Sequence, residues 1–464
     1  MGKNDTLPCF KSYDIRGRVP EELDDDLAYK IGQAFSHVKG VKKVAVGHDI
    51  RLSSERLCKA LTAGLCAGGT HVLQLGLCAT EEVYHAAFSL ETDGVDGGVM
   101  ITASHNPADY NGMKFVSRGG RSVAGSSGLQ RMAELIGGAM LPSPVKHRGQ
   151  VEVATGKGGY IDHLLSYVDG MQLSPLQLVV NSGNGCAGPL IDLLAERLPF
   201  EFVRLNHQPD GTFPHGVPNP LLAENQAETA AAVQLHGADL GIAWDGDGDR
   251  CFFWDENGTF IDGYYIVGLL ALEMLQHEPG GKILYDPRLT WNTEELVGEV
   301  GGRAVMTESG HALIKERMRR ENAVYGGETT AHHYFRKFGY CDSGMIPWLL
   351  LCAVLSRTGQ SLSQIVGERM QRFPVSGEIN STVADPDAII ARIERQFPDG
   401  EKRYLDGLSV SYPEYRFSIR KSNTEPLLRL NVETRANRML LQQKTEELLA
   451  LIRCWDNEKC NKQL

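Results

Sequence analysis

The sequence lacks several features that mark secreted and membrane proteins. Its ten cysteines form no CxxC pair and lie mostly in apolar stretches such as LTAGLC and LLLCAVL, which predicts buried, reduced thiols. The first residues, MGKNDTLPCFKSYDIRG, contain no apolar signal core, and the longest apolar run, Met345–Leu355, is too short to span a bilayer. We therefore expect a cytoplasmic protein with no membrane partner.

Basic residues are not in excess either, and this balance limits the choice of partner. The chain of 464 residues has 47 Lys and Arg against 58 Asp and Glu, a formal net charge of −11. Such a surface disfavours nucleic acid, whereas an anionic small molecule would need a local basic pocket. The hydrophobic fraction of 42% is typical of a soluble protein, and the length predicts about three or four domains. The composition does not indicate an oligomeric state.

Short apolar strands alternate with helical segments in three successive repeats. The strand-like runs read KKVAVGHD, HVLQLG and DGGVMITA, then LQLVVNSG, FEFVRLN and ADLGIAWD, then KILYDPR, RAVMTES and NAVYGGE. Helical segments such as SSERLCKALTAGLCAG, PLIDLLAERL and ALIKERMRR lie between them. Apolar strands bounded by Gly, Asp or Asn are typical of buried parallel sheets. The pattern predicts three consecutive α/β domains with mixed, mostly parallel sheets.

The C-terminal part of the chain shows a different pattern. A strand-like EINSTVA precedes a helical PDAIIARIERQF, and GLSVSYP, YRFSIRKS and LLRLNVE then alternate as antiparallel strands do. An amphipathic segment, MLLQQKTEELLALIRCW, follows. These features predict a smaller α+β domain. We place the four domains at residues 1–155, 156–257, 258–373 and 374–464.

The third strand of each α/β repeat is followed by a polar loop, and ligands bind at this edge of open parallel sheets. In the first loop, TASHNPADYNGMK, Ser104 comes directly after the strand. We expect its hydroxyl to be exposed on the turn that His105, Asn106 and Pro107 impose, where basic groups could activate it. The alternative is an ordinary Asn-Pro turn in which the serine caps a helix. The GxSxG elbow of serine hydrolases is absent.

The second loop, DGDGDR, carries Asp245, Asp247 and Asp249. In an extended segment this spacing points the three carboxylates the same way. Three hard oxygen ligands suit Mg²⁺, whereas without a cation the carboxylates of a solvated acidic turn would repel one another. A calcium EF-hand is excluded because Arg250 replaces the required glycine and because the flanks, ADLGIAW and CFFWDE, indicate strands.

Three further motifs are less specific when taken alone. The GxGxxG of Gly183, Gly185 and Gly188 resembles a dinucleotide fingerprint, but a tight strand-to-helix turn explains the glycines equally well. RKSNTEPLLR combines two arginines with short donors, which suits a phosphate cradle or a surface hairpin. GGETTAHHYF offers a glutamate and histidines that could hold sugar hydroxyls or could simply pack.

Taken together, these motifs resemble those of the α-D-phosphohexomutase superfamily. TASHNP, DGDGDR, the GE-containing loop and R-x-SNTEP occur in the family's order and approximate spacing, over nearly the whole chain. FKSYDIRG and GETTAHHYF are most similar to the bacterial phosphomannomutases of this superfamily. The resemblance implies a heart-shaped arrangement of three α/β domains and one α+β domain around one active site.

The resemblance also implies a role for each candidate residue. Ser104 is expected to carry the phosphoryl group and to share a Mg²⁺ ion with Asp245, Asp247 and Asp249. The other residues expected to act in catalysis are Arg16, Lys114 and His311. The residues expected to bind substrate are Tyr13, Arg250, Arg288, Lys315, Glu328, Thr330, His332, Arg420, Ser422, Asn423, Thr424 and Arg429.

The implied activity is the interconversion of mannose 6-phosphate and mannose 1-phosphate through a phosphoserine and a hexose 1,6-bisphosphate, with hexose phosphates as the small-molecule partners. Alternatives are a phosphoglucomutase, a dual-specificity mutase, a Mg²⁺-dependent sugar phosphatase and a non-catalytic sugar-phosphate-binding protein. Many relatives have serine and glycine where this chain has Thr330 and Ala331, and Thr329 replaces a commonly larger residue. These departures bear on sugar selectivity and rate.

Overall fold

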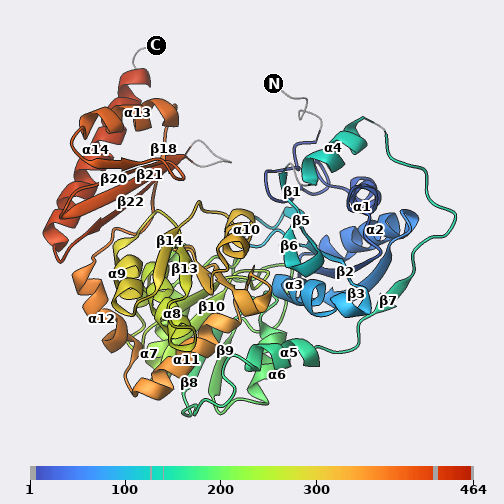
Figure 1. Cartoon of the computed structure of the whole chain (residues 1–464), viewed down its shortest axis with the longest axis horizontal. Coiled ribbons are helices and arrows are strands. Elements are labelled where there is room, and N and C mark those ends of the chain that lie inside the picture. The colour runs from blue at the N-terminus through green and yellow to red at the C-terminus, as the bar shows by residue number, and fades with distance from the viewer. Residues whose placement is uncertain (1–6, 126–127, 139, 422–426, 461–464) are drawn as a thin grey trace. The chain divides into compact units, whose positions relative to one another are not determined.

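Short strands form four sheets in the computed structural model, which describes residues 7–125, 128–138, 140–421 and 427–460, the last four by their backbone alone. Figure 1 follows the chain through these sheets. Two compact units contain them. Unit 1 comprises Met1–Phe260, Met318–Arg320 and His332–Ser361, and unit 2 comprises Ile261–Arg317, Glu321–Ala331 and Leu362–Leu464.

The central strands of the first sheet of unit 1 are buried on both faces. Its strands are β1 (Ile15–Arg18), β2 (Lys43–His48), β3 (His71–Leu77), β4 (Gly97–Ile101), β5 (Tyr110–Ser117), β6 (Arg121–Ser122) and β7 (Val151–Val153). The helices around it are α1 (Asp25–Lys39), α2 (Ser54–Ala67), α3 (Thr80–Ser89) and α4 (Leu129–Gly137). Val44 and Val46 of β2 join the core that α1, α2 and α4 cover, whereas Ala45 packs with Ala86 of α3 on the other face. Successive side chains of a strand alternate between faces, so an unbroken apolar run is required here.

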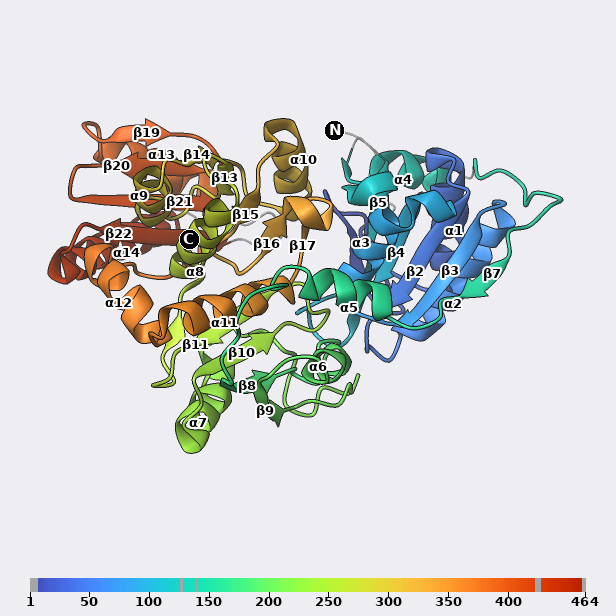
Figure 2. The same ribbon diagram turned by 60° about the horizontal axis from the view of Figure 1, so that its bottom comes forward.

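The second sheet of unit 1 carries the acidic loop at one edge. Its strands are β8 (Gln177–Asn181), β9 (Glu201–Leu205), β10 (Leu240–Trp244), β11 (Cys251–Trp254) and β12 (Phe260–Ile261). Strand β8 pairs in parallel with β9 and β10, and β11 runs antiparallel to β10. Other elements of unit 1 are α5 (Gly158–Leu165), α6 (Gly188–Ala195), α7 (Ala227–His236), α11 (Ile346–Thr358), β16 (His333–Phe335) and β17 (Cys341–Asp342). Figure 2 shows α7 alongside β8 and β10.

The GxGxxG glycines lie in the tight turn between β8 and α6, where backbone segments approach closely. A Cβ at Gly185 would lie 2.7 Å from the carbonyl oxygen of Gly246, and one at Gly188 would lie 2.0 Å from that of His207. Any larger residue would push these segments apart. Packing therefore accounts for the two glycines without a nucleotide.

Unit 2 contains a parallel group of strands and an antiparallel sheet. In the first group, β13 (Lys282–Tyr285) pairs in parallel with β14 (Arg303–Met306) and β15 (Tyr325–Gly327). The helices of this unit before its antiparallel sheet are α8 (Gly263–His277), α9 (Trp291–Glu299), α10 (His311–Glu321), of which Met318–Arg320 belong to unit 1, and α12 (Leu362–Arg372). The antiparallel sheet has the order β18 (Ile379–Thr382), β22 (Leu427–Thr434), β21 (Tyr415–Lys421), β20 (Leu408–Ser411) and β19 (Glu401–Arg403). Helices α13 (Pro386–Gln396) and α14 (Arg438–Cys460) pack on this sheet through Ile393 and Leu448.

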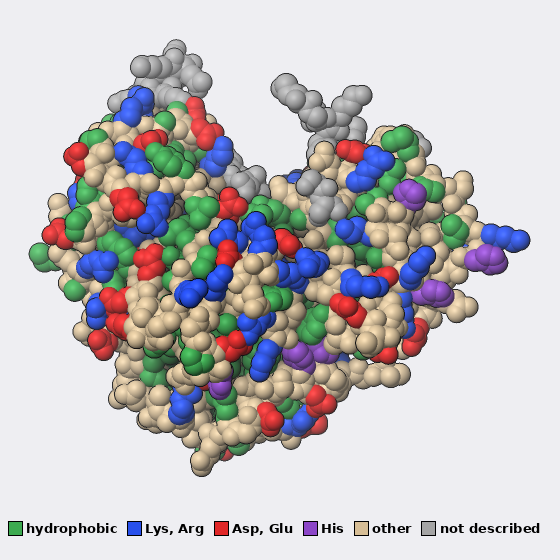
Figure 3. Space-filling view, in the orientation of Figure 1, with side chains coloured by type: hydrophobic (Ala, Val, Ile, Leu, Met, Phe, Trp, Pro, Cys, Tyr) green, Lys and Arg blue, Asp and Glu red, His purple; other side chains and the backbone are tan. Residues whose placement is uncertain are grey.

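The predicted fold class is confirmed, and the nine strand-like runs of the three repeats all form strands. The antiparallel strands β1 and β5 that complete the first sheet make that sheet mixed, as expected. The cysteines whose side chains the structure describes are free thiols, and all but Cys66 and Cys454 are buried. No helix among the described residues has both the length and the apolar character needed to cross a bilayer. On the face that Figure 3 shows, acidic and basic side chains are interspersed.

Candidate active site

Ser104 lies in the turn after β4, and its side chain is buried rather than exposed as expected. Its φ of 48° is left-handed, a conformation that disfavours residues with a Cβ by about 1–2 kcal/mol. Only 4% of the residue is accessible, because the acidic loop packs directly against the turn. A Cβ at Gly246 would lie 2.6 Å from the Ser104 carbonyl oxygen, and Ser104 Oγ donates a hydrogen bond to Asp245 Oδ2 at 2.5 Å. The chain continues into strand β5, so the helix-cap alternative is wrong.

Two arginines hold this turn in its strained conformation. Arg51 is buried, and its Nη2 donates to the Ser104 carbonyl oxygen at 2.8 Å, while its Nη1 donates to the Pro107 carbonyl oxygen at 2.6 Å. Arg16 of β1 donates through Nη1 to the Ala103 carbonyl oxygen at 2.7 Å and to Asn106 Oδ1 at 2.6 Å. These charge-assisted bonds fix the backbone on both sides of the serine.

The acidic loop between β10 and β11 is a turn and not the extended segment that we expected. The Gly248 amide donates to the Asp245 carbonyl oxygen at 3.1 Å, and Gly248 has a φ of 73°, which glycine adopts without strain. The turn brings carboxylate oxygens of Asp245, Asp247 and Asp249 within 4.8 Å of one another. The expected convergence is therefore present, although a turn produces it and not the alternation of a strand.

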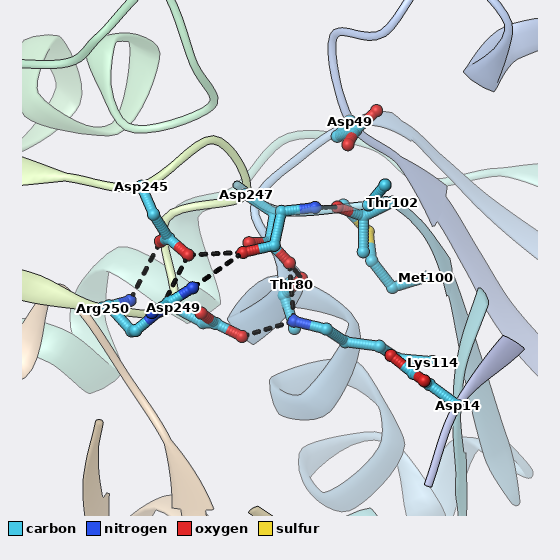
Figure 4. Close-up of polar contacts among 12 residues, drawn as sticks. Asp14, Asp49, Thr80, Met100, Thr102, Lys114, Asp245, Asp247, Asp249 and Arg250 are labelled. Atoms are coloured by element: carbon cyan, nitrogen blue, oxygen red, sulfur yellow. Dashed lines mark hydrogen bonds and ion pairs between the residues drawn. The ribbon is translucent and has the colours of Figure 1, made fainter. Parts of the chain in front are cut away.

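Two cations contact the three carboxylates (Figure 4). Lys114 of β5 places its Nζ 2.7 Å from Asp247 Oδ2 and 2.5 Å from Asp249 Oδ2. Arg250 Nε lies 3.0 Å from Asp245 Oδ2. Burial lowers the pKa of Lys114, but Asp247 and Asp249 outweigh burial, so its pKa lies above the ordinary value. Lys114 and Arg250 are thus ion-pair partners of the three buried carboxylates.

The acidic cluster fits a hard divalent cation. Burial, with repulsion from Asp249 and Asp247, raises the pKa of Asp245 above its ordinary value even though Arg250 lowers it. Asp247 Oδ1 is buried and has no hydrogen-bond partner among the residues that the structure describes. A buried carboxylate oxygen without a donor is costly unless a cation contacts it. An all-oxygen donor set is the kind that Mg²⁺ and Ca²⁺ select.

A histidine lies at the border of this cluster. His332 forms an isolated antiparallel bridge with Arg250, and its Nε2 lies 3.7 Å from Asp249 Oδ1. A second group of potential metal ligands consists of Asp249, His332 and Asp342. Its donor atoms also lie within 4.8 Å of one another. Asp249 belongs to both groups, so the two are parts of one centre.

Unit 2 contains a separate polar centre around Arg288. This arginine follows β13, and its Nε donates to Asp286 Oδ1 at 3.0 Å, while its Nη2 donates to Glu328 Oε1 at 3.2 Å. The Gly310 amide, just before α10, also donates to Glu328 Oε1 at 3.1 Å. Burial lowers the pKa of Arg288, yet Asp286 and Glu328 reverse this effect and raise it above the ordinary value.

The antiparallel sheet of unit 2 adds two more arginines to this centre. Arg420 of β21 and Arg429 of β22 are direct cross-strand partners. Both contact the carboxylate of Glu378, Arg420 through Nη2 at 3.2 Å and Arg429 through Nη1 at 3.1 Å. Arg288 Nη1 lies 3.8 Å from the same carboxylate. Three guanidiniums therefore converge on one acidic group, an arrangement that also suits a phosphate.

The remaining predicted residues are distributed over both units. Tyr13 is half-buried just before β1, and Thr330 is half-buried in the loop after β15. His311 begins α10, and Lys315, on the same helix, is fully buried. Ala331 has a φ of 66°, so alanine occupies a position where glycine would be less strained. The predicted phosphate ligands Ser422, Asn423 and Thr424 lie outside the described residues.

Sequence reasoning missed several residues that contact the predicted ones, namely Arg51, Thr80, Asp286 and Glu378. Arg51 follows β2, Thr80 follows β3 and Asp286 follows β13. Functional side chains gather at the carboxyl ends of parallel strands, and the prediction considered only the third strand of each repeat. The ends of the other strands would have indicated these three residues as well. Glu378 precedes an antiparallel strand, and we find no sequence signal for it.

The α/β sheets and the two charged centres are those of an enzyme that handles phosphorylated small molecules. The chain belongs to the phosphoglucomutase/phosphomannomutase family. It matches the alpha/beta/alpha domains I, II and III of this family over residues 8–134, 158–258 and 262–373, and its C-terminal domain over residues 378–450. The resemblance inferred from the motifs is thereby confirmed.

Individual relatives resemble the chain over almost its whole length. A protein named "Phosphohexose mutases" from Xanthomonas campestris pv. campestris is 55% identical over 454 residues, 97% of this chain and 100% of that protein. A phosphomannomutase from Salmonella typhimurium is 53% identical, with 96% of this chain and 99% of that protein covered. A crystal structure of a phosphoglucomutase/phosphomannomutase family protein from Burkholderia thailandensis superposes with a TM-score of 0.86 at 33% identity, covering 96% of this chain and 97% of that one.

Proposed function

We propose that the chain is a phosphomannomutase that interconverts mannose 6-phosphate and mannose 1-phosphate through a phosphoserine and a hexose 1,6-bisphosphate. The observation that carries the proposal is the 2.5 Å hydrogen bond from Ser104 Oγ to Asp245 Oδ2, because it places the predicted phosphoryl carrier against a cation site. The 53% identity to a phosphomannomutase supports mannose as the sugar.

Mg²⁺ is the cation that we assign to Asp245, Asp247, Asp249 and the phosphorylated Ser104, with Mn²⁺ as its experimental substitute. When bound, the ion would offset charge on the phosphoryl group during transfer. Lys114 and Arg250 would keep the three carboxylates in place and add positive charge.

Around Ser104, the chain's own residues would bind the phosphoryl group and exclude water. We assign to Arg16 the task of holding the serine turn, since it donates to the carbonyl oxygen of Ala103, the residue before Ser104. The buried position of Ser104 would protect its phosphate from hydrolysis. Tyr13 and His332 are proposed to contact the substrate at this centre.

The second centre would bind the phosphate that the hexose already carries. Arg420 and Arg429, with Ser422, Asn423 and Thr424, are proposed as its ligands, because paired guanidiniums match phosphate oxygens. Glu328 would accept hydrogen bonds from ring hydroxyls, and the Thr330 hydroxyl would donate to or accept from them. Other proposed roles are substrate binding by Arg288 and Lys315 and proton transfer by His311.

Substitution of Ser104 by alanine tests the proposal. S104A should abolish conversion of mannose 1-phosphate to mannose 6-phosphate, because no acceptor for the phosphoryl group remains. The matched control is S117A, since Ser117 lies on β5 and bonds only to the Arg121 carbonyl oxygen among the hydrogen bonds described for its side chain. Intact-mass analysis of the wild type should detect a phosphate that S104A lacks. Near-normal turnover by S104A would contradict the proposal.

A broader phosphohexose mutase is the second candidate, and the relative of that name at 55% identity supports it. In the loop after β15, Thr330 and Ala331 stand where many relatives have serine and glycine, and the additional methyl groups bear on sugar selectivity. Comparison of kcat/KM for mannose, glucose and glucosamine 1-phosphates would distinguish a selective enzyme from a dual one. Inorganic phosphate release without isomer formation would instead indicate a phosphatase.

A further inference from the structure

Thr80, the first residue of α3, contacts the acidic loop through two hydrogen bonds. Its backbone N–H donates to the Asp247 carbonyl oxygen at 3.0 Å, and its Oγ1 donates to Asp247 Oδ2 at 2.5 Å. Thr80 is fully buried, and 167 positions separate it from Asp247 in the sequence. Figure 4 shows Thr80 beside Asp247 and Lys114.

The start of α3 contacts this loop, while the cap bond of the helix runs from the Ala79 N–H to Glu82 Oε1 at 2.9 Å. Ala79 occupies the N-cap position, where it offers no side-chain capping group, although Ser, Thr, Asp or Asn there would stabilise a helix by about 1 kcal/mol. A Cβ at Gly248 would lie 3.4 Å from the Ala79 Cβ, an ordinary van der Waals distance, so the N-cap residue lies next to the loop. The Thr80 hydroxyl likewise contacts the loop and makes no cap bond within its own helix.

The two oxygens of the Asp247 carboxylate differ in their hydrogen-bonding partners. Thr80 Oγ1 and Lys114 Nζ both contact Oδ2, at 2.5 and 2.7 Å. Oδ1 is buried without a hydrogen-bond donor among the described residues. A carboxylate held in this way has one oxygen fixed by protein donors and the other available to a cation.

We infer that Thr80 is a positioning residue for the metal site, which orients the Asp247 carboxylate so that Oδ1 is presented to the cation. The inference rests on the proposed function, because it assumes that the acidic cluster binds a metal ion. Hydrogen-bonding partners of metal ligands typically contribute 10–100-fold to metal affinity. Lys114 also contacts Oδ2, but it divides its charge between Asp247 and Asp249. The Thr80 hydroxyl is therefore the donor specific to Asp247.

The test compares Thr80→Val, which removes the hydroxyl and keeps the shape, with Thr80→Ser, which keeps the hydroxyl. Mn²⁺ binding to metal-free protein is measured from the free-ion signal in electron paramagnetic resonance. T80V should raise the Mn²⁺ Kd roughly 10-fold or more, whereas T80S should stay within about twofold of the wild type. At saturating Mn²⁺ the kcat of T80V should return toward the wild-type value, with a raised apparent KM for the metal.

The matched control is Thr70→Val. Thr70 is also fully buried, and its Oγ1 donates to the Val41 carbonyl oxygen at 2.9 Å, remote from the acidic loop. T70V should lose stability comparably and bind Mn²⁺ as the wild type does. Equal Kd values for T80V and wild type, or equal weakening in T80V and T80S, would overturn the inference.

Failure of the inference is distinguishable from failure of the proposed function. Asp245→Asn removes a proposed ligand that Thr80 does not touch. If wild type and D245N bind Mn²⁺ equally, the acidic cluster is not the metal site and both ideas fail. If D245N loses binding while T80V does not, the metal site stands and the role of Thr80 alone is rejected.

Discussion

At the scale of single residues, the two centres hold their buried charges differently. In the acidic cluster, three carboxylates converge within 4.8 Å of one another, and Asp247 Oδ1 is buried without a hydrogen-bond donor among the described residues. Around Glu378, three arginines converge on one carboxylate. The first centre is a cluster of carboxylates, whereas in the second each arginine is paired with acidic side chains, among them Asp286, Glu328 and Glu378.

Loss of a guanidinium at the second centre should weaken substrate binding. Arg420→Ala should raise the KM for mannose 1-phosphate roughly 10–100-fold, because hydrogen bonds to charged groups contribute about 1.5–3 kcal/mol. The kcat should change less, since a phosphate anchor acts equally in the ground state and the transition state. Steady-state kinetics of R420A and R403A would check this. Arg403 is exposed and pairs with Glu401, so R403A should resemble the wild type.

At the scale of elements, helix α3 connects the acidic loop to α11. Thr80 contacts Asp247 at the start of the helix, and the next residue, Glu81, is fully buried. Glu81 accepts hydrogen bonds from the Ser343 hydroxyl and from the Met345 amide, at 3.2 Å for the latter, just before α11 begins. Burial raises the pKa of Glu81 from an ordinary 4.5 to about 8, although the hydrogen bond from Ser343 lowers it.

This shift predicts how stability depends on pH. Between about pH 4.5 and 8, the folded protein holds a proton on Glu81 that the unfolded chain has released. The stabilising contribution of the neutral acid is therefore complete below pH 4.5 and is lost as pH rises toward 8, by up to about 1.4 kcal/mol per pH unit.

Denaturant unfolding of Glu81→Gln at several pH values would measure this loss. The stability of the wild type relative to E81Q should fall as pH rises from 5 to about 8. The control variant is E152Q, because Glu152 is exposed on β7 and pairs with Lys43. A stability difference between wild type and E81Q that does not change with pH would show that Glu81 is ionised in the folded protein.

At the scale of the whole molecule, the two centres belong to different units. Asp245, Asp247 and Asp249 lie in unit 1, whereas Arg288 and Arg420 lie in unit 2. Binding to the folded state stabilises it by RT ln(1 + [L]/Kd), about 2.7 kcal/mol at 100 times Kd. A bound metal ion should therefore stabilise unit 1 more than unit 2.

Hydrogen-exchange mass spectrometry would locate this effect. Addition of Mn²⁺ to metal-free protein should slow exchange in peptides that span residues 79–84 and 244–250, with little change in peptides of the antiparallel sheet of unit 2. D245N should remove the protection. Equal protection of both units, or protection that persists in D245N, would contradict the assignment of the metal to unit 1.

Much of the fold could be predicted because its signals are local. The apolar runs that became β2, β3 and β4 are continuous because both faces of their sheet are buried, and Val44 and Ala45 pack on opposite faces. The three aspartates were identifiable because they are close in sequence and share one chemistry. The order of the motifs then indicated the family.

The parts that could not be predicted depend on contacts between distant segments. The burial of Ser104 arises because the acidic loop, 141 positions away, packs on its turn. Thr80 was missed because a threonine at a helix start is normally a cap, and only its distance to Asp247 gives it another role. Glu378 was missed because its three arginines come from β21, β22 and the loop after β13.

By itself the sequence determined which segments are strands and helices, and which side chains could hold a phosphoryl group, a cation or a phosphate. These properties follow from hydrophobic periodicity and from residue chemistry, which operate over a few positions. Only the tertiary structure decided that Ser104 is buried against Asp245, that Asp247 Oδ1 has no hydrogen-bond donor among the described residues, and that Glu378 contacts three arginines. Hydrogen bonds and ion pairs depend on distances of a few ångströms, which the folded chain alone sets between residues far apart in sequence.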